Sequence, residues 1–223
     1  MMLAFHNDPA LKAFVLNELT AHQKADELVK GQYWEDGKGC AVGCTLEAVR
    51  RFQGEDATIE HNKHALYESR LGIPEVLARL EESIFEKLDN GASQEWPLRF
   101  TAAIRPGADL AMVWPKFAVW LLGEFLPPLT TNEWALKSLK DVAGLYGEWA
   151  NGEKPSVERW DSAADYADLA ASRAAAYAAY AGHSAAGNSA VYAGNSAAYA
   201  GHSAAKGARV LMADKLIEIL ADC

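Results

Sequence analysis

Small residues dominate one stretch near the C-terminus, and this stretch limits the fold more than any other feature of the chain. Between Ala163 and Ala208, 31 of 46 residues are Ala, Gly or Ser. Alanine is the best helix former, but a stretch with so few large side chains buries little apolar surface of its own. It must therefore form helices that pack closely on another surface, or stay disordered.

A repeat within this stretch favours packed helices. The pentapeptide Ala-Gly-Asn/His-Ser-Ala begins at Ala181, Ala186, Ala193 and Ala200. The last two intervals are seven residues long, which places Gly187, Gly194 and Gly201 on one face of a helix. A row of glycines on one face lets two helix backbones approach closely, so that dispersion contacts form along the whole row.

The first interval of the repeat differs from the others and predicts a turn. It is five residues long, so Gly182 and Gly187 fall on different sides of a helix. We therefore expect a turn at residues 182–188 between two antiparallel helices, 156–181 and 188–221. Each glycine in a helix interior costs about 0.5–1 kcal/mol relative to alanine, which close packing must offset. The alternatives are a disordered tail, and a Gly/Ala face that joins two copies or fits a partner helix.

The rest of the chain has the pattern of a series of helices, which makes the predicted fold class all-α, a multi-helix bundle. The clearest helix spans residues 74–88, where apolar side chains form one stripe opposite charged ones. Asp8 and Pro9 provide an N-cap and a first-turn proline for another helix. Further helices are predicted at residues 45–52, 62–71, 97–104, 109–125 and 132–151. No stretch alternates for long enough to predict a strand.

The predicted helices divide into two regions. Residues 1–130 form a helical domain that contains a loop rich in Gly and Cys at residues 31–45. Residues 131–223 form a second helical domain, which ends in the alanine-rich hairpin at residues 156–221. One continuous domain built from the same helices is the alternative.

The charge and the cysteine content limit which partners the protein can bind and in which cellular compartment it is expected. The net charge is −9 and the pI about 5.2, so the chain has no basic field to bind nucleic acid or an anionic membrane surface. The most apolar stretch, residues 108–126, is interrupted by Pro115, Lys116 and Glu124, and predicts a buried helix rather than a membrane span. Three cysteines and no secretory signal sequence favour a cytoplasmic location.

The Gly/Cys loop carries the first candidate for chemistry. Cys44 is expected where a helix begins, and the positive end of a helix dipole lowers the pKa of a thiol. His61 or His64, or else His22, would then act as the base. This arrangement predicts a cysteine-dependent hydrolase or transferase.

The same residues also have a spacing close to that of a zinc site. Cys40 and Cys44 are followed after sixteen residues by His61 and His64, and these four side chains would be the ligands of a structural zinc ion. The third interpretation is that both cysteines are small buried apolar residues beneath a loop held in place by aromatic side chains, and that the histidines lie at the surface. In that case no cofactor is needed.

Three segments of the chain resemble known families. Residues 39–45 (GCAVGCT) and 67–81 (YESRLGIPEVLARLE), together with the alanine-rich tail, resemble uncharacterised alanine-rich proteins of bacteriophages and prophages. The tail, from AYAAYA to residues 212–220 (MADKLIEIL), is similar to a helical family described as immunity protein five-like. The resemblance implies a phage or mobile-element accessory protein, and it supplies no catalytic residues.

These patterns lead us to expect a non-enzymatic, protein-binding helical module of the inhibitor or immunity type. Its partner would be a protein, bound through an acidic helical surface. The alternative function is the enzyme that uses Cys44.

Overall fold

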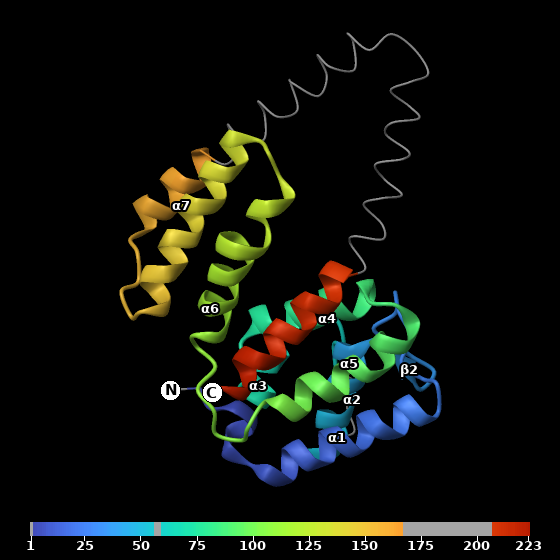
Figure 1. The fold of residues 1–223 in the computed structure, drawn as a ribbon. Helices are drawn as coiled ribbons and strands as arrows, with labels where there is room; N and C mark the ends of the chain where they lie inside the picture. Colours follow the sequence, from blue (N-terminus) through green and yellow to red (C-terminus); the bar gives the residue numbers. More distant parts are fainter. Residues whose placement is uncertain (1, 56–58, 167–206) are drawn as a thin grey trace, which may run out of the picture. The chain divides into compact units, whose positions relative to one another are not determined.

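A computed structural model describes residues 2–55, 59–166 and 207–223 and confirms an all-α fold (Figure 1). The named elements are η1 (Ala4–Asn7), α1 (Pro9–Lys24), β1 (Trp34–Glu35), β2 (Lys38–Gly39), α2 (Ala41–Phe52), α3 (Leu66–Leu71), α4 (Glu75–Lys87), α5 (Asn90–Ala103), α6 (Val113–Trp120), η2 (Leu121–Phe125), η3 (Pro127–Leu129) and α7 (Glu133–Ala150). Two further helical stretches span residues 157–166 and 207–221. The predicted turn at 182–188 and the repeated glycines lie outside the described residues.

The chain forms two compact units, and their boundary differs from the division expected at residue 130. The first unit contains residues up to Trp114 together with the C-terminal helix 207–221. The second unit begins at Pro115 and includes α7 and helix 157–166. Sequence order did not predict this division, because the last helix packs with the first part of the chain.

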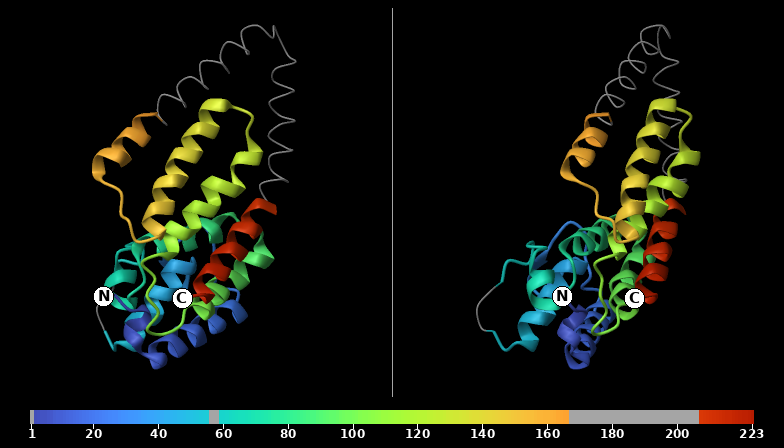
Figure 2. Two further views of the ribbon diagram at one scale, coloured as in Figure 1. Left: turned by 60° about the vertical axis from the view of Figure 1, so that its left-hand side comes forward. Right: turned by 90° about the vertical axis from the view of Figure 1, so that its left-hand side faces the viewer.

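The first unit is built around α2, which contacts α1, α3 and α4, while α5 contacts α1 and α4 (Figures 1 and 2). Its largest fully buried side chains are Phe5, Tyr67, Phe85, Trp96 and Phe100. Helix 207–221 buries Leu216 and Leu220 and pairs with α5 through Asp214, whose Oδ1 lies 2.7 Å from Arg99 Nη2.

Helix α5 begins earlier than the sequence predicted. Residues 90 and 91 were expected to end the preceding helix, but Asp89 caps α5 by accepting a hydrogen bond of 2.9 Å from the backbone N–H of Ala92. Pro97 therefore lies inside α5 rather than at its start. A side-chain cap outweighs the turn-forming tendency of Asn-Gly here.

In the second unit, α6 continues into the π-helical turn η2, which contacts α7. The side chain of Asn132 caps α7 through the N–H groups of Trp134 and Ala135 at 3.0 and 3.1 Å. Helix α6 begins at Val113, so Pro115 lies in its first turn, where a missing N–H is tolerated.

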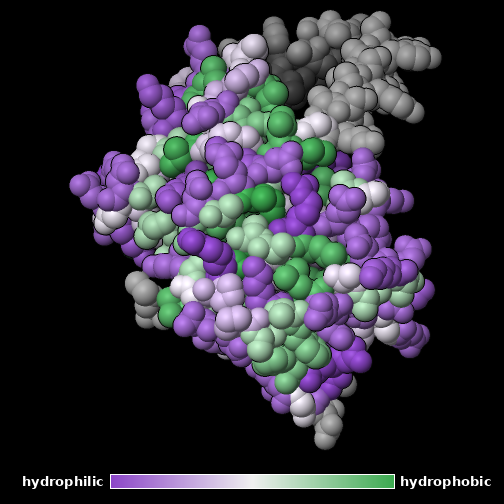
Figure 3. All heavy atoms as spheres, turned by 60° about the horizontal axis from the view of Figure 1, so that its bottom comes forward, coloured by the Kyte–Doolittle hydropathy of each residue, from purple (hydrophilic) through white to green (hydrophobic). Residues whose placement is uncertain are grey.

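Hydrophobic and hydrophilic residues are interspersed on the face of the molecule in Figure 3, where hydrophilic side chains separate the hydrophobic areas. Among the residues that the structure describes, no helix has both the length and the apolar character that crossing a membrane requires.

Candidate functional site

The Gly/Cys loop folds into a small hairpin that rests on the start of α2. Strands β1 and β2 pair antiparallel, and the turn between them uses Asp36 and Gly37 with φ of 49° and 83°. Two positive φ angles in a two-residue turn match the twist of a tight hairpin, and Asp-Gly favours them. The sequence predicted a loop here without strands, because two-residue strands are too short to leave an alternating pattern.

Two glycines allow the backbone of Tyr33 to lie directly against α2. A Cβ atom at Gly43, in the first turn of α2, would come within 1.5 Å of the Tyr33 carbonyl oxygen, and one at Gly39 within 2.1 Å. Real Cβ atoms never approach oxygen this closely, so only glycine fits at either position. Gly39 and Gly43 thus fix the position of the loop.

The two cysteines of this region are buried in surroundings that disfavour their thiolate forms. Cys44 lies inside α2 with its side chain in the core, and its Sγ donates a hydrogen bond of 3.4 Å to the Gly39 carbonyl. Burial raises the pKa of Cys44, and it raises the pKa of Cys40, the N-cap residue of α2, to about 12. The lowered thiol pKa expected for Cys44 is therefore wrong, because loss of hydration outweighs the helix dipole.

The histidines singled out by the sequence pair with carboxylates. His61 Nε2 lies 3.1 Å from Glu47 Oε2, and its ring stacks on Trp34 at a centroid distance of 5.4 Å. His64 Nε2 lies 2.5 Å from Glu82 Oε2. Their hydrogen bonds thus go to α2 and α4 carboxylates, while the hydrogen bond of Cys44 goes to the backbone.

His22 also pairs with a carboxylate and contacts Trp34. Its Nδ1 lies 2.8 Å from Glu27 Oε2, and its ring meets Trp34 edge-on at 5.4 Å. Over the described part of the chain, no group of three or more His, Cys, Asp or Glu side chains is arranged to hold a metal ion. The ligand set suggested for zinc, Cys40, Cys44, His61 and His64, does not come together as such a group.

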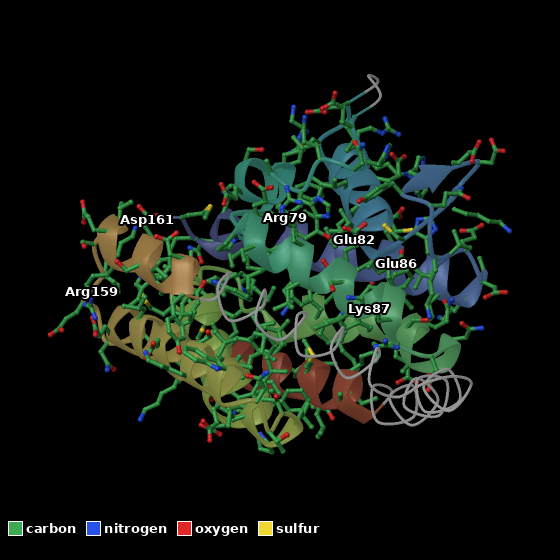
Figure 4. All side chains as sticks on the ribbon, turned by 90° about the horizontal axis from the view of Figure 1, so that it is seen from above. Arg79, Glu82, Glu86, Lys87, Arg159 and Asp161 are labelled. Atoms are coloured by element: carbon green, nitrogen blue, oxygen red, sulfur yellow. The ribbon has the colours of Figure 1, made fainter. Side chains whose placement is uncertain are left out.

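Helix α4 holds the loop through its carboxylates. Both oxygens of Glu86 accept from the N–H of Gly31 at 3.0 Å, and the Tyr33 hydroxyl bonds to Glu82, which raises the pKa of Tyr33 to about 12. Figure 4 shows Arg79, Glu82 and Glu86 in succession along α4. The acidic face of this helix is thus used inside the first unit.

A buried polar cluster lies behind these contacts, and sequence reasoning missed it. The cluster consists of Thr45, Tyr67 and Glu81, one each from α2, α3 and α4, and all three are buried. The Tyr67 hydroxyl donates to Glu81 Oε2 at 2.8 Å, and Trp96 Nε1 donates to the Glu81 carbonyl at 3.0 Å. Burial raises the pKa of Glu81 to about 8, so the neutral form of its side chain predominates at pH 7. The available signal was the position of Glu81 on the apolar stripe of its helix.

The second unit carries a groove and a set of half-exposed aromatic side chains. The groove has a volume of about 420 Å³ and is lined by residues of α7 and helix 157–166, among them Lys137, Arg159 and Tyr166. Both cations are paired: Lys137 Nζ lies 2.5 Å from Asp141, and Arg159 bonds to Glu148 through two nitrogens.

Aromatic rings gather on these same helices. The half-exposed rings, which we call the aromatic surface, belong to Tyr146, Trp149 and Trp160, whose centroids lie 4.8–6.4 Å apart. Nearby in sequence, Leu129 and Val157 are 66% and 69% exposed. Among the described residues of α7, only Leu145 is buried.

No known family model, curated protein or solved structure matches this chain.

Proposed function

We propose that this chain is a non-enzymatic, protein-binding helical module, and that the second unit provides its binding surface. The observation that carries the proposal is the partly buried aromatic surface on α7 and helix 157–166, together with the exposed apolar side chains of Leu129 and Val157 in the same unit. Exposed aromatic and large apolar side chains are enriched in protein interfaces, where they fill pockets of the partner. An accessory role as an inhibitor or immunity-like protein of a phage or mobile element is part of this proposal.

The acidic charge of the chain indicates which kind of protein it would bind. Residues 115–166 contain eight acidic and five basic side chains, and the whole chain has a net charge of −9. Complementary charge speeds association and orients the two proteins. The expected partner is therefore a protein with an apolar pocket surrounded by basic side chains.

The alternative, a hydrolase or transferase that uses Cys44, receives no support from the site. A nucleophilic thiol needs a lowered pKa and a base within hydrogen-bond reach. Cys44 is buried, its pKa is raised, and its hydrogen bond goes to the Gly39 carbonyl.

The test begins with affinity capture from the native host and continues with titration of the purified captured protein by calorimetry. Replacing Leu129 and Val157 together by Ser is expected to weaken binding at least about tenfold, as loss of buried apolar anchors does. Leu211→Ser is the matched control, because Leu211 is 55% exposed but belongs to the first unit.

Two results would contradict the proposal. One is equal loss of affinity in Leu211→Ser and in the double variant. The other is an affinity that does not fall as salt is raised, because attraction between an acidic module and a basic partner is screened by salt.

A further inference from the structure

Two polar atoms in the buried cluster of the first unit lack a partner. Glu81 Oε1 and Thr45 Oγ1 are both shielded from solvent, and neither forms a hydrogen bond of regular geometry with a described atom of the protein, although the Thr45 hydroxyl faces the Tyr67 oxygen. Leaving such a group unsatisfied costs about 1–3 kcal/mol, so a folded protein rarely leaves one in its core without a water molecule to bind it.

Both atoms belong to side chains that flank one phenol oxygen. Tyr67 donates its hydroxyl hydrogen to Glu81 Oε2 at 2.8 Å, and the Thr45 hydroxyl interacts with the same Tyr67 oxygen. The carboxyl group is fixed at this place, because Trp96 holds the Glu81 backbone and α2, α3 and α4 surround it. It therefore has no route to bulk water.

The protonation of Glu81 determines what its free oxygen needs. Oε2 accepts the hydrogen of Tyr67, so the proton of the neutral carboxyl belongs on Oε1. Oε1 then requires an acceptor. The other ionisable groups that act on this cluster, Glu82 and Cys40, both favour the neutral forms of Glu81 and Tyr67.

We propose that one water molecule is bound between Glu81 and Thr45 and closes a ring of hydrogen bonds that includes the Tyr67 hydroxyl. Glu81 Oε1 donates to the water, the water donates to Thr45 Oγ1, Thr45 donates to the Tyr67 oxygen, and Tyr67 donates to Glu81 Oε2. Each hydroxyl donor in the ring has one acceptor. Buried waters in proteins characteristically satisfy polar groups that the fold leaves unpaired.

The direct test is a crystal structure of the full chain at pH 6, at a resolution that shows ordered water. We expect a solvent peak about 2.7–3.0 Å from both Glu81 Oε1 and Thr45 Oγ1. A well-defined core without a peak at this place would overturn the proposal.

A double-mutant cycle provides a second test, with urea unfolding of the full chain as the measurement. The cycle is measured in the Tyr67→Phe background, where the two residues can no longer couple through the Tyr67 hydroxyl. There the loss in the folding equilibrium constant for Thr45→Val with Glu81→Met should still be at least about fivefold smaller than the product of the two single losses, because the water joins the two residues. Thr101→Val is the matched control, since Thr101 is a buried threonine on α5. The losses in the folding equilibrium constant for Thr101→Val and Glu81→Met should multiply in the double variant. Losses for the Thr45 pair that multiply in the same way would contradict the ring.

Discussion

The two units of this protein use similar helices in different ways. Helix α2 has twelve residues, and nine of them, from Ala41 to Val49, are buried. Helix α7 has eighteen residues, and among them only Leu145 is buried. The difference follows from their neighbours, because α2 is enclosed by α1, α3, α4 and the hairpin loop, whereas η2 is the main contact of α7 among the described elements. An amphipathic pattern therefore shows which side of a helix is apolar, but the fold decides how much of that side is covered.

The largest difference between the units should appear when a methyl group is added to a glycine of the first unit. Gly43→Ala places a Cβ about where the Tyr33 carbonyl oxygen lies, 1.5 Å away. We expect a loss of stability of more than about 4 kcal/mol, or failure to fold, because backbone rather than a flexible side chain must move. Urea unfolding followed by circular dichroism measures this. A loss below about 1 kcal/mol would contradict the close packing of the loop.

The next largest effect should come from removing one tryptophan in each unit. Trp96 is fully buried and donates to the Glu81 carbonyl, so Trp96→Ala should cost about 3–5 kcal/mol. Trp160 is half-exposed, and Trp160→Ala should cost about 1 kcal/mol or less. Thermal unfolding of both variants measures the contrast. Equal losses would mean that the second unit has a core as well packed as the first.

The stability of the first unit should also depend on pH through Glu81. The folded pKa is about 8 and the ordinary value is 4.5, so the folded protein binds a proton that the unfolded chain releases. Stability is therefore greatest below pH 4.5 as far as this group is concerned, and falls as the pH rises through 8, by on the order of 2 kcal/mol between pH 6 and 8. Glu81→Gln should remove this slope in urea unfolding. If stability still falls with pH in the Glu81→Gln variant, the pH dependence comes from another ionisable group.

The smallest expected effect is a gain in the second unit. Nothing lies within 4 Å of a Cβ built on Gly144 of α7, so Gly144→Ala should stabilise the helix by about 0.5–1 kcal/mol. It is the counterpart of Gly43→Ala, since both replace a glycine inside a helix. Destabilisation measured by urea unfolding would show that this face of α7 is covered.

The sequence predicted the helices well where capping residues and periodicity agree. The expected end of a helix at Leu71 is confirmed, where Gly72 takes a φ of 62°, and the next helix starts just after Pro74. Prediction from the sequence failed where the local structure depends on tertiary packing. The glycines of residues 31–45 predicted an ordered loop without strands, but two of them make room for the carbonyl of Tyr33, which no pattern within the loop reveals.

The candidate site was predicted only in part. Cys44 and His61 were chosen for the chemistry of their side chains, and the structure places the first in the core and the second against Glu47 and Trp34. The buried carboxyl of Glu81 was overlooked because Glu82 and Glu86 next to it are ordinary charged residues of the same helix. Its burial depends on how α2, α3 and α5 pack on α4, which the sequence of α4 alone does not reveal.

Because two thiols are buried in the first unit, their alkylation can be used to detect local opening of that unit. Cys40 and Cys44 can be alkylated only while the start of α2 is exposed to solvent, whereas Cys223 is half-buried at the end of the chain. The alkylation rate of the two buried thiols in the folded protein, divided by their rate in the unfolded chain, thus gives the free energy of local opening without added probes. A substitution that loosens the hairpin loop would be recognised by faster modification of the two buried thiols alone.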